Sequence, residues 1–228
     1  MAYQYRYYPL AAGLTMLWLF AGLLCKAQAA RADGQRQDHS CTVDAGGSYA
    51  IPKGLDGKNF ENGWGVRGGV GVALWQTKEK RGWSVFLSSH YNYDKFRAMK
   101  EALATAKMDN GQLDAATSAH GGFTAVTLDP EFRYAVDRRL NFYGSGGFGW
   151  FRRTVDFEGV NPGSLTQPDV GSFGRVASNS GVYDIGGGVN VGRKRSGGLM
   201  IFVEGRVYHG AAINRSSTLV PVSAGIRW

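Results

Sequence analysis

In the last eleven residues, TLVPVSAGIRW (218–228), every second position from Val220 to Trp228 is apolar. The apolar positions are Val220, Val222, Ala224, Ile226 and Trp228. The positions between them are Pro221, Ser223, Gly225 and Arg227. A period of two is typical of a strand with one apolar and one polar face. The stretch therefore predicts a terminal strand, and the fold depends on whether its apolar face meets a protein core or lipid.

The same period recurs in seven earlier stretches of the chain, which we interpret as further strands. They are residues 41–52, 62–76, 82–94, 120–137, 140–153, 181–193 and 198–210. The composition supports this interpretation, because 34 glycines and 13% aromatic residues are typical of a β protein rather than a helical one. The sequence thus predicts an all-β domain of eight strands.

The connections between these strands alternate in length. Three are short and charged, namely TKEKRG (77–82), DRR (137–139) and KRSG (194–197). Four are expected to be longer, namely residues 53–61, 95–119, 154–180 and 211–217. Residues 95–108 within the second of these show helical spacing at Phe96, Met99, Leu103 and Ala106. Short turns on one side and long loops on the other indicate an up-and-down antiparallel transmembrane barrel, with periplasmic turns and extracellular loops.

The amino terminus differs from the rest of the chain. A basic start with Arg6, an apolar run from Leu10 to Cys25 and small residues at Ala27 and Ala29 are typical of a secretory signal peptide. We expect residues 1–29 to be the signal peptide, 30–40 a short periplasmic segment and 41–228 the barrel domain. Cleavage after Ala32 and a retained membrane anchor are the alternatives.

Processing at Ala29 changes the charge and the cysteine content. Loss of Arg6 and Lys26 from the 26 basic residues leaves 24 against 18 acidic ones, a net charge of +6. This surplus suits anionic lipid head groups, but no Arg/Lys cluster with interleaved aromatic residues indicates nucleic-acid binding. Cys41 is then the single cysteine, so no intramolecular disulfide is expected.

Two features favour a barrel whose apolar strand faces meet lipid over one whose apolar strand faces form a protein core. Strands of about ten residues match the ~9–11 that a tilted membrane strand needs, whereas soluble strands average five or six. The faces opposite the apolar ones carry glycine, small polar and charged residues, which suit a narrow lumen. The charged residues expected in the lumen are Arg67, Glu131, Arg133, Asp184, Glu204, Arg206 and Arg227. We expect Glu204 to pair with Arg206 or Arg227; a soluble sandwich or lipocalin-like barrel is the alternative fold.

Aromatic residues gather near the ends of the apolar faces, where an interfacial girdle is expected. They are Trp64, Trp83, Tyr91, Tyr93, Phe142 and Trp150, together with Trp228.

The runs NFYGSGGFGW (141–150), FVEGRVYHG (202–210) and LVPVSAGIRW (219–228), with the signal peptide, resemble the small OmpA/OmpW-like eight-stranded outer-membrane barrels of Gram-negative bacteria. The resemblance covers nearly the whole processed chain. It implies that the barrel-assembly machinery, aided by periplasmic chaperones, reads the terminal residues Val220, Val222, Ala224, Ile226 and Trp228.

No motif in the sequence clearly indicates a cofactor site, a metal site or a catalytic site. GSGGFG (144–149) matches a dinucleotide-binding pattern, but a strand and not a helix follows it, and the histidines lack metal-ligand spacing. We therefore expect no cofactor and no metal. Ser88, Ser89 and His90, or Ser118 and His120, leave a lipid A acyl-modifying enzyme as a minor alternative.

The sequence thus predicts a non-enzymatic, porin-like outer-membrane barrel with a structural or surface-interaction role. An eight-stranded barrel is about wide enough for side chains to fill its lumen, and a narrow channel for small solutes is the alternative. The expected partners are outer-membrane lipids and lipopolysaccharide. The barrel is expected to be a monomer.

Overall fold

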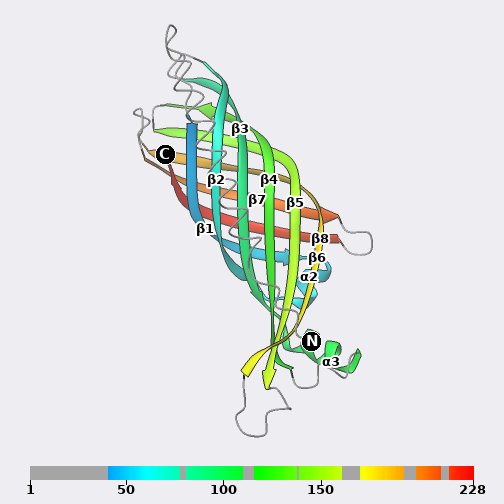
Figure 1. Cartoon of the computed structure of the whole chain (residues 1–228). Coiled ribbons are helices and arrows are strands. Elements are labelled where there is room, and N and C mark those ends of the chain that lie inside the picture. Colours follow the sequence, from blue (N-terminus) through cyan, green and yellow to red (C-terminus); the bar gives the residue numbers. More distant parts are fainter. Residues whose placement is uncertain are drawn as a thin grey trace. The chain divides into compact units, whose positions relative to one another are not determined.

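The computed structural model describes residues 41–77, 81–109, 116–137, 139–160, 170–192, 199–211 and 216–228. The expected signal peptide and residues 30–40 lie outside the described residues. Eight strands form one closed antiparallel ring in chain order, as the sequence predicts (Figure 1). They are β1 (Cys41–Lys53), β2 (Gly63–Gln76), β3 (Gly82–Arg97), β4 (Ala116–Ala135), β5 (Leu140–Val160), β6 (Val170–Gly192), β7 (Met200–Ala211) and β8 (Ser216–Arg227).

The ring closes where the first strand pairs with the last. Ten registered pairs join β1 to β8, from Asp44 opposite Arg227 to Lys53 opposite Thr218. Beyond Arg227 the ladder continues, because the Val43 N–H donates to the Trp228 carbonyl at 2.8 Å and the Trp228 N–H donates to the Val43 carbonyl at 2.9 Å. Closure pairs the backbone groups of both terminal strands and leaves no sheet edge, which is a requirement for any β structure in hydrocarbon.

The strands differ in length from the sequence-based expectation. Residues 154–180 were expected to form a loop, but β5 continues to Val160 and β6 begins at Val170, so that 161–169 alone connect them. This hairpin extends past the neighbouring strands at the end of the barrel that carries the helices (Figure 1). The connection expected at 211–217 is also shorter, since β8 begins at Ser216. Both connections are therefore shorter than the sequence predicted.

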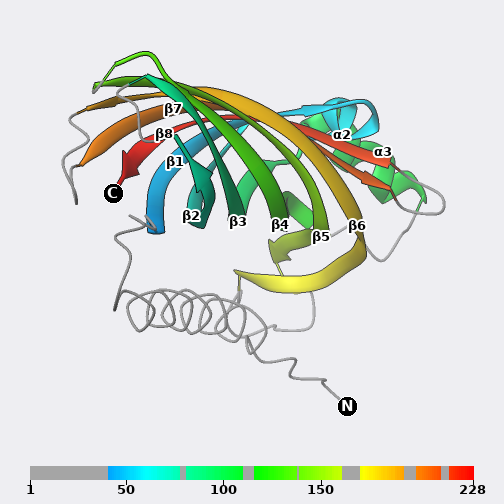
Figure 2. The same ribbon diagram turned by 90° about the horizontal axis from the view of Figure 1, so that it is seen from above.

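Two short helices lie at the same end of the barrel (Figure 2). α3 (Lys100–Asp109) confirms the helical spacing after β3, but Phe96 belongs to β3 and points into the barrel. α2 (Leu55–Asn59) falls in a segment that the sequence analysis treated as loop. Gly54 precedes α2 with φ 65°, a conformation that glycine adopts without a Cβ clash.

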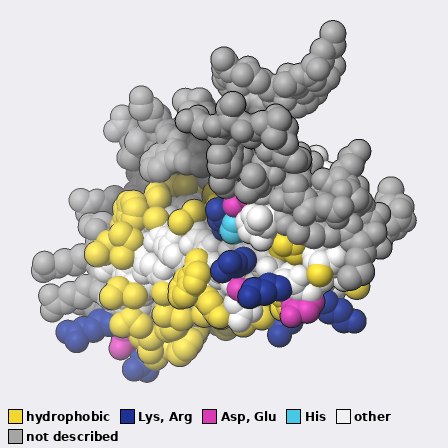
Figure 3. All heavy atoms as spheres, turned by 90° about the horizontal axis from the view of Figure 1, so that it is seen from below, with side chains coloured by type: hydrophobic (Ala, Val, Ile, Leu, Met, Phe, Trp, Pro, Cys, Tyr) yellow, Lys and Arg dark blue, Asp and Glu magenta, His cyan; other side chains and the backbone are white. Residues whose placement is uncertain are grey.

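The two faces of the sheet have opposite polarity. On β2, Val66 is 57% exposed on the outside, whereas the adjacent Arg67 is 4% exposed inside. Large apolar side chains are exposed on the outer face from β2 to β8, for example Leu74, Phe132, Phe148, Ile185, Ile201 and Val222. Hydrophobic side chains cover a continuous part of one face, with charged ones gathered beside it (Figure 3). The soluble-barrel alternative requires the reverse arrangement and is wrong.

Neither of the helices in the described part of the chain is long and apolar enough to cross a membrane.

The turn between β4 and β5 is organised by one carboxylate. The backbone N–H groups of Arg139 and Leu140 donate to Asp137 Oδ1 at 2.6 and 2.8 Å. These two hydrogen bonds favour the ionised form and hold the pKa of Asp137 below its ordinary value. The short turn thus needs few residues to reverse the chain.

The tight β4–β5 pairing predicts a position where a side chain cannot be added. A Cβ on Gly149 would overlap the Val126 carbonyl and lie 2.7 Å from Thr127 Cα, whereas a Cβ on Gly205 would meet no atom within 4 Å. We expect Gly149→Val to reduce the folded fraction, at a cost of about 1–3 kcal/mol for overpacking. Gly205→Val should fold as the parent does. The difference in gel migration between unheated and boiled samples measures folding, and equal behaviour of the two variants would contradict the described register.

Candidate functional site: a closed lumen

Ion-paired side chains fill the half of the lumen nearer the short turns. The ionisable members, here called the lumen cluster, are Asp44, Arg67, His90, Asp129, Glu131, Arg133, Asp184, Glu204, Arg206 and Arg227. Every strand except β5 contributes a member, and β5 contributes Ser145 as a hydrogen-bond partner. Each member is 6% exposed or less. The structure thus brings all seven charged residues singled out from the sequence into one buried network.

Arg206 lies at the centre of the lumen cluster. Its Nε contacts Glu204 Oε1 at 2.8 Å, and its Nη1 contacts Asp129 Oδ2 at 2.6 Å and Asp184 Oδ1 at 3.0 Å. Its Nη2 donates to Ser145 Oγ at 2.8 Å. Partners from β4, β5, β6 and β7 therefore converge on one guanidinium, whose planar set of donors suits several acceptors at once.

A second group of contacts completes the ring on the other side of the lumen. Arg227 reaches Glu131 Oε1 at 3.1 Å and Asp44 Oδ2 at 3.3 Å, and Arg133 Nε contacts Glu131 Oε1 at 2.5 Å. Arg67 links the two groups by contacting Glu204, and its Nε lies 3.6 Å from Asp44 Oδ1. Glu204 therefore pairs with Arg206, as expected, but its other partner is Arg67 and not Arg227.

His90 closes this ring of contacts. Its Nδ1 lies 2.6 Å from Asp129 Oδ2, and its Nε2 lies 4.0 Å from Asp44 Oδ2. From the sequence, His90 was considered only as an enzyme residue, and Asp44 and Asp129 were not expected in the lumen. All three lie on the inward-facing alternate positions of β1, β3 and β4, so the period of two was the signal that could have found them.

Aromatic rings cover several of the lumen cations. The Arg133 guanidinium carbon lies 3.6 Å from the centroid of Phe86, and that of Arg227 lies 4.7 Å from Tyr143 and 5.6 Å from Phe202. A cation held over an aromatic face is attracted by the ring quadrupole, most strongly where water is excluded. These contacts leave little space for solvent around the arginines.

The other half of the lumen is filled by an apolar cluster, here called the aromatic plug. It contains Ala50, Phe60, Phe96, Phe123, Ala125, Phe151, Val182, Tyr208 and Leu219. Phe123 is at its centre, with ring centroids 4.9 Å from Phe96, 5.5 Å from Phe151 and 6.2 Å from Phe60. The lumen is therefore obstructed twice along its axis, first by charges and then by rings.

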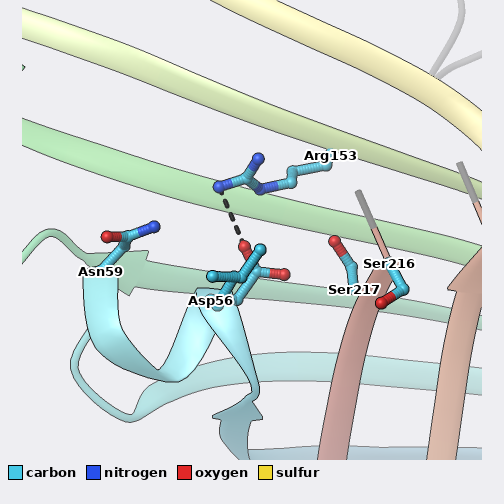
Figure 4. A pocket seen from close by; sticks show the side chains of 6 residues that line it. Asp56, Asn59, Arg153, Ser216 and Ser217 are labelled. Carbon is cyan, nitrogen blue, oxygen red and sulfur yellow. Dashed lines mark ion pairs between the residues drawn. The ribbon is translucent and has the colours of Figure 1, made fainter. Parts of the chain in front are cut away.

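An ion pair holds α2 over the aromatic plug. Arg153 Nη2 on β5 contacts Asp56 Oδ1 at 2.9 Å, and the Arg153 guanidinium carbon lies 5.5 Å from the Phe60 ring centroid (Figure 4). Asp56 is 3% exposed although it lies in a connection between strands. A cavity of about 120 Å³ remains beside this pair, lined by Leu55, Asp56, Asn59, Arg153, Ser216 and Ser217. It has room for a few water molecules.

The aromatic residues singled out for a girdle lie on the outer face at both ends. Trp64 and Trp150 are 72% and 41% exposed toward the helix-bearing end, with Tyr91 and Tyr93 half-buried nearby. Trp83 and Phe142 are exposed toward the short turns. The structure adds partners that the sequence analysis did not select, since Trp83 packs on Tyr134 and Trp64 packs on Tyr49, with centroids 5.0 and 4.8 Å apart.

The terminal residues place their apolar side chains outside the barrel. Val222, Ile226 and Trp228 are 48%, 42% and 44% exposed, Ala224 is exposed and Val220 is half-buried. Recognition of these terminal residues by the barrel-assembly machinery stays a prediction.

The serine and histidine pairs considered for catalysis are not arranged as nucleophile and base. His90 faces the lumen, whereas Ser89 faces outward on the same strand. Ser118 Oγ and His120 Nε2 both contact Glu158 Oε2, at 3.2 and 3.3 Å. In a catalytic triad the histidine lies between the serine and the acid, so this arrangement does not match one. Among the described residues no group of three or more His, Cys, Asp or Glu side chains is arranged to hold a metal ion.

The central position of Arg206 predicts a large effect on stability. Arg206→Met removes the cation that Asp184 contacts and takes one partner each from Glu204 and Asp129, so we expect the free energy of unfolding to fall by about 3–5 kcal/mol. The matched variant Arg139→Met, in the exposed β4–β5 turn, should change it by less than about 0.5 kcal/mol. Urea unfolding in lipid vesicles measures both values, and equal effects would show that the lumen cluster does not stabilise the barrel.

The chain is similar in fold to solved outer-membrane barrels. No protein-family model and no curated protein matches the chain. Neisserial surface protein A (NspA) is 14% identical with a TM-score of 0.51, and the match covers 83% of this chain and 97% of NspA. The attachment invasion locus protein Ail of Yersinia pestis is 10% identical with a TM-score of 0.39, over 83% of this chain and 97% of Ail. The outer membrane protease OmpT of Escherichia coli is 10% identical with a TM-score of 0.36, over 85% of this chain and 97% of OmpT. The chain thus has the fold of the small eight-stranded outer-membrane barrels, of which NspA is an example.

Proposed function

We propose that the chain is an outer-membrane barrel with a closed lumen, which serves the envelope as a structural or surface-interaction element and not as a pore. The observation that carries this proposal is the double obstruction of the lumen by the lumen cluster and the aromatic plug. Conduction requires a continuous water-filled path, and neither obstruction leaves one among the described residues.

The proposed location is supported by the polarity of the two faces. Soluble monomers rarely expose apolar patches of more than a few hundred Å², whereas here apolar side chains are exposed on the outer face from β2 to β8. In a bilayer the hydrocarbon keeps such an apolar surface away from water. The aromatic residues at both ends of the barrel suit the two membrane–water interfaces. In this proposal residues 1–29 direct export, and the terminal strand β8 directs assembly.

The surface role is supported by the end of the barrel that carries α2, α3 and the long β5–β6 hairpin. These elements extend beyond the ring of strands on one side only (Figure 1). In the proposed orientation that side faces outward from the cell, because the short turns and both ends of the barrel domain lie on the other. The elements are positioned to meet molecules at the cell surface.

Planar-bilayer recording tests the closed lumen. We expect the reconstituted barrel to show no steady conductance, because the lumen cluster and the aromatic plug obstruct the path in series. Arg206→Ala alone should also be silent, since the aromatic plug remains. Steady conductance in the parent protein that changes in Arg206→Ala would contradict this proposal and support the alternative, a narrow channel for small solutes.

A further inference from the structure

A polar cavity lies at the helix-bearing end of the barrel, between α2, β5 and the first residues of β8. Its volume is about 120 Å³, and it is lined by Leu55, Asp56, Asn59, Arg153, Ser216 and Ser217 (Figure 4). Leu55 and Ser216 are exposed, whereas Asp56 and Ser217 are buried. The cavity therefore opens to the surface on one side and ends on buried polar groups on the other.

The ion pair that lines this cavity leaves one atom unused on each partner. Arg153 Nη2 contacts Asp56 Oδ1 at 2.9 Å, but Asp56 Oδ2 and Arg153 Nε have no hydrogen-bond partner among the described residues. The Asp56 side chain is 4% exposed. A buried carboxylate oxygen without a donor and a buried N–H without an acceptor each cost free energy. A ligand that supplies both partners is therefore favoured here.

The charges of the pair select an uncharged ligand. Asp56 and Arg153 already neutralise each other, so an anion is repelled by Asp56 and a cation by Arg153 at the same short range. Hydroxyl groups avoid this conflict, because each donates one hydrogen bond and accepts others without carrying a charge. Two neighbouring hydroxyls can donate to Asp56 Oδ2 through one and accept from Arg153 Nε through the other.

The other groups that line the cavity suit the same ligand. The Asn59 amide and the hydroxyls of Ser216 and Ser217 both donate and accept, so they match a ligand hydroxyl in either direction. Leu55 is 55% exposed and adds apolar surface beside these groups, where it can cover carbon-bound hydrogens of a ring. Polar groups at an edge and carbon-bound hydrogens on a face are the features of a sugar ring.

The volume of the cavity fits part of one sugar ring. A water molecule occupies about 30 Å³ in the liquid, so the cavity holds about four groups of that size. Two adjacent carbons with their two hydroxyl oxygens have that number of heavy atoms. The rest of the ring then remains outside the cavity, beside Leu55.

We propose that this cavity binds one edge of a neutral sugar residue through two vicinal hydroxyl groups. Asp56 Oδ2 accepts a hydrogen bond from one hydroxyl, Arg153 Nε donates to the other, and the serines and Asn59 complete the contacts. This inference rests on the proposed function, in which the helix-bearing end faces outward from the cell. It adds the class of molecule that this end binds.

Saturation-transfer NMR on the purified barrel in phosphocholine micelles tests the site, with methyl α-mannopyranoside as the probe and glycine, a small zwitterion, as a competitor. Ser217→Leu fills the cavity and leaves both members of the Asp56–Arg153 pair in place, so we expect the sugar signal to be lost. The matched variant Ser89→Leu, which faces outward on β3, should give the parent signal. Asp56→Asn should weaken binding about tenfold, because the acceptor loses its charge.

Three results would overturn the site: no sugar signal in the parent protein, an equal signal in Ser217→Leu, or displacement of the sugar by glycine. The third result would show a site for zwitterions. Gel migration before and after boiling checks that each variant folds. If Ser217→Leu does not fold, Ser216→Ala with Ser217→Ala replaces it, with an expected loss of about tenfold for two hydrogen bonds.

The source of the sugar and the proposed function are tested separately. Competition by polysaccharide released from the cell's own lipopolysaccharide would support a ligand of the same cell, and competition by mannan would support a foreign one. Cell fractionation tests the outer-membrane location, and planar-bilayer recording tests the closed lumen. Failure of the proposed function is therefore distinguishable from failure of this site.

Discussion

The opposite polarity of the two faces of the sheet, in the half of the barrel nearer the short turns, is the constraint on which this structure depends. Apolar side chains such as Val66 and Ile201 point outward, and charged ones such as Arg67 and Arg206 point inward. A shift of one residue in the register of any strand pair would move the apolar side chains to the inner face and the charged ones to the outer face. The register between β1 and β8 therefore closes the ring and also keeps each set of side chains on its own face. The closed ring pairs the backbone hydrogen-bonding groups of the strands. The polarity of the two faces then determines whether lipid or water must surround the barrel.

Burial of the lumen cluster is tolerated because each of its members has a group of opposite charge type within 4.0 Å, on another strand or, for Arg133, two residues away on the same strand. Moving one ion out of water costs several kcal/mol, and good geometry with several partners is needed to offset this cost. Arg206 has three carboxylate partners, and Glu131 has Arg133 and Arg227. The same contacts that stabilise the barrel also obstruct its lumen, so stability and closure have one physical cause.

The period of two was enough to predict the strands and the side of the sheet on which Arg67, Glu204 or Trp64 lies. It could not predict pairs across the lumen, because the stagger of the strands decides that Arg227 meets Glu131 and Asp44 and not Glu204. The extension of β6 was missed because residues 159–180, rich in glycine and serine, show no clear alternation of apolar and polar side chains, whereas Val155 and Phe157 on β5 do alternate with Thr154 and Asp156. α2 was missed because Asp56 and Phe60 become buried only through Arg153 and the aromatic plug, which are distant in sequence.

The central claim is that lipid covers the outer face, and spin-label accessibility in lipid vesicles tests it most directly. In a background with Cys25 and Cys41 replaced by serine, labels would be attached at Val203→Cys and Ile185→Cys, which are outward positions 47% and 69% exposed. A label at Arg139→Cys in the exposed turn serves as the aqueous reference. The account predicts that oxygen, but not a water-soluble nickel chelate, relaxes the two outward labels. Nickel relaxation at Val203 and Ile185 as strong as at Arg139 would contradict it.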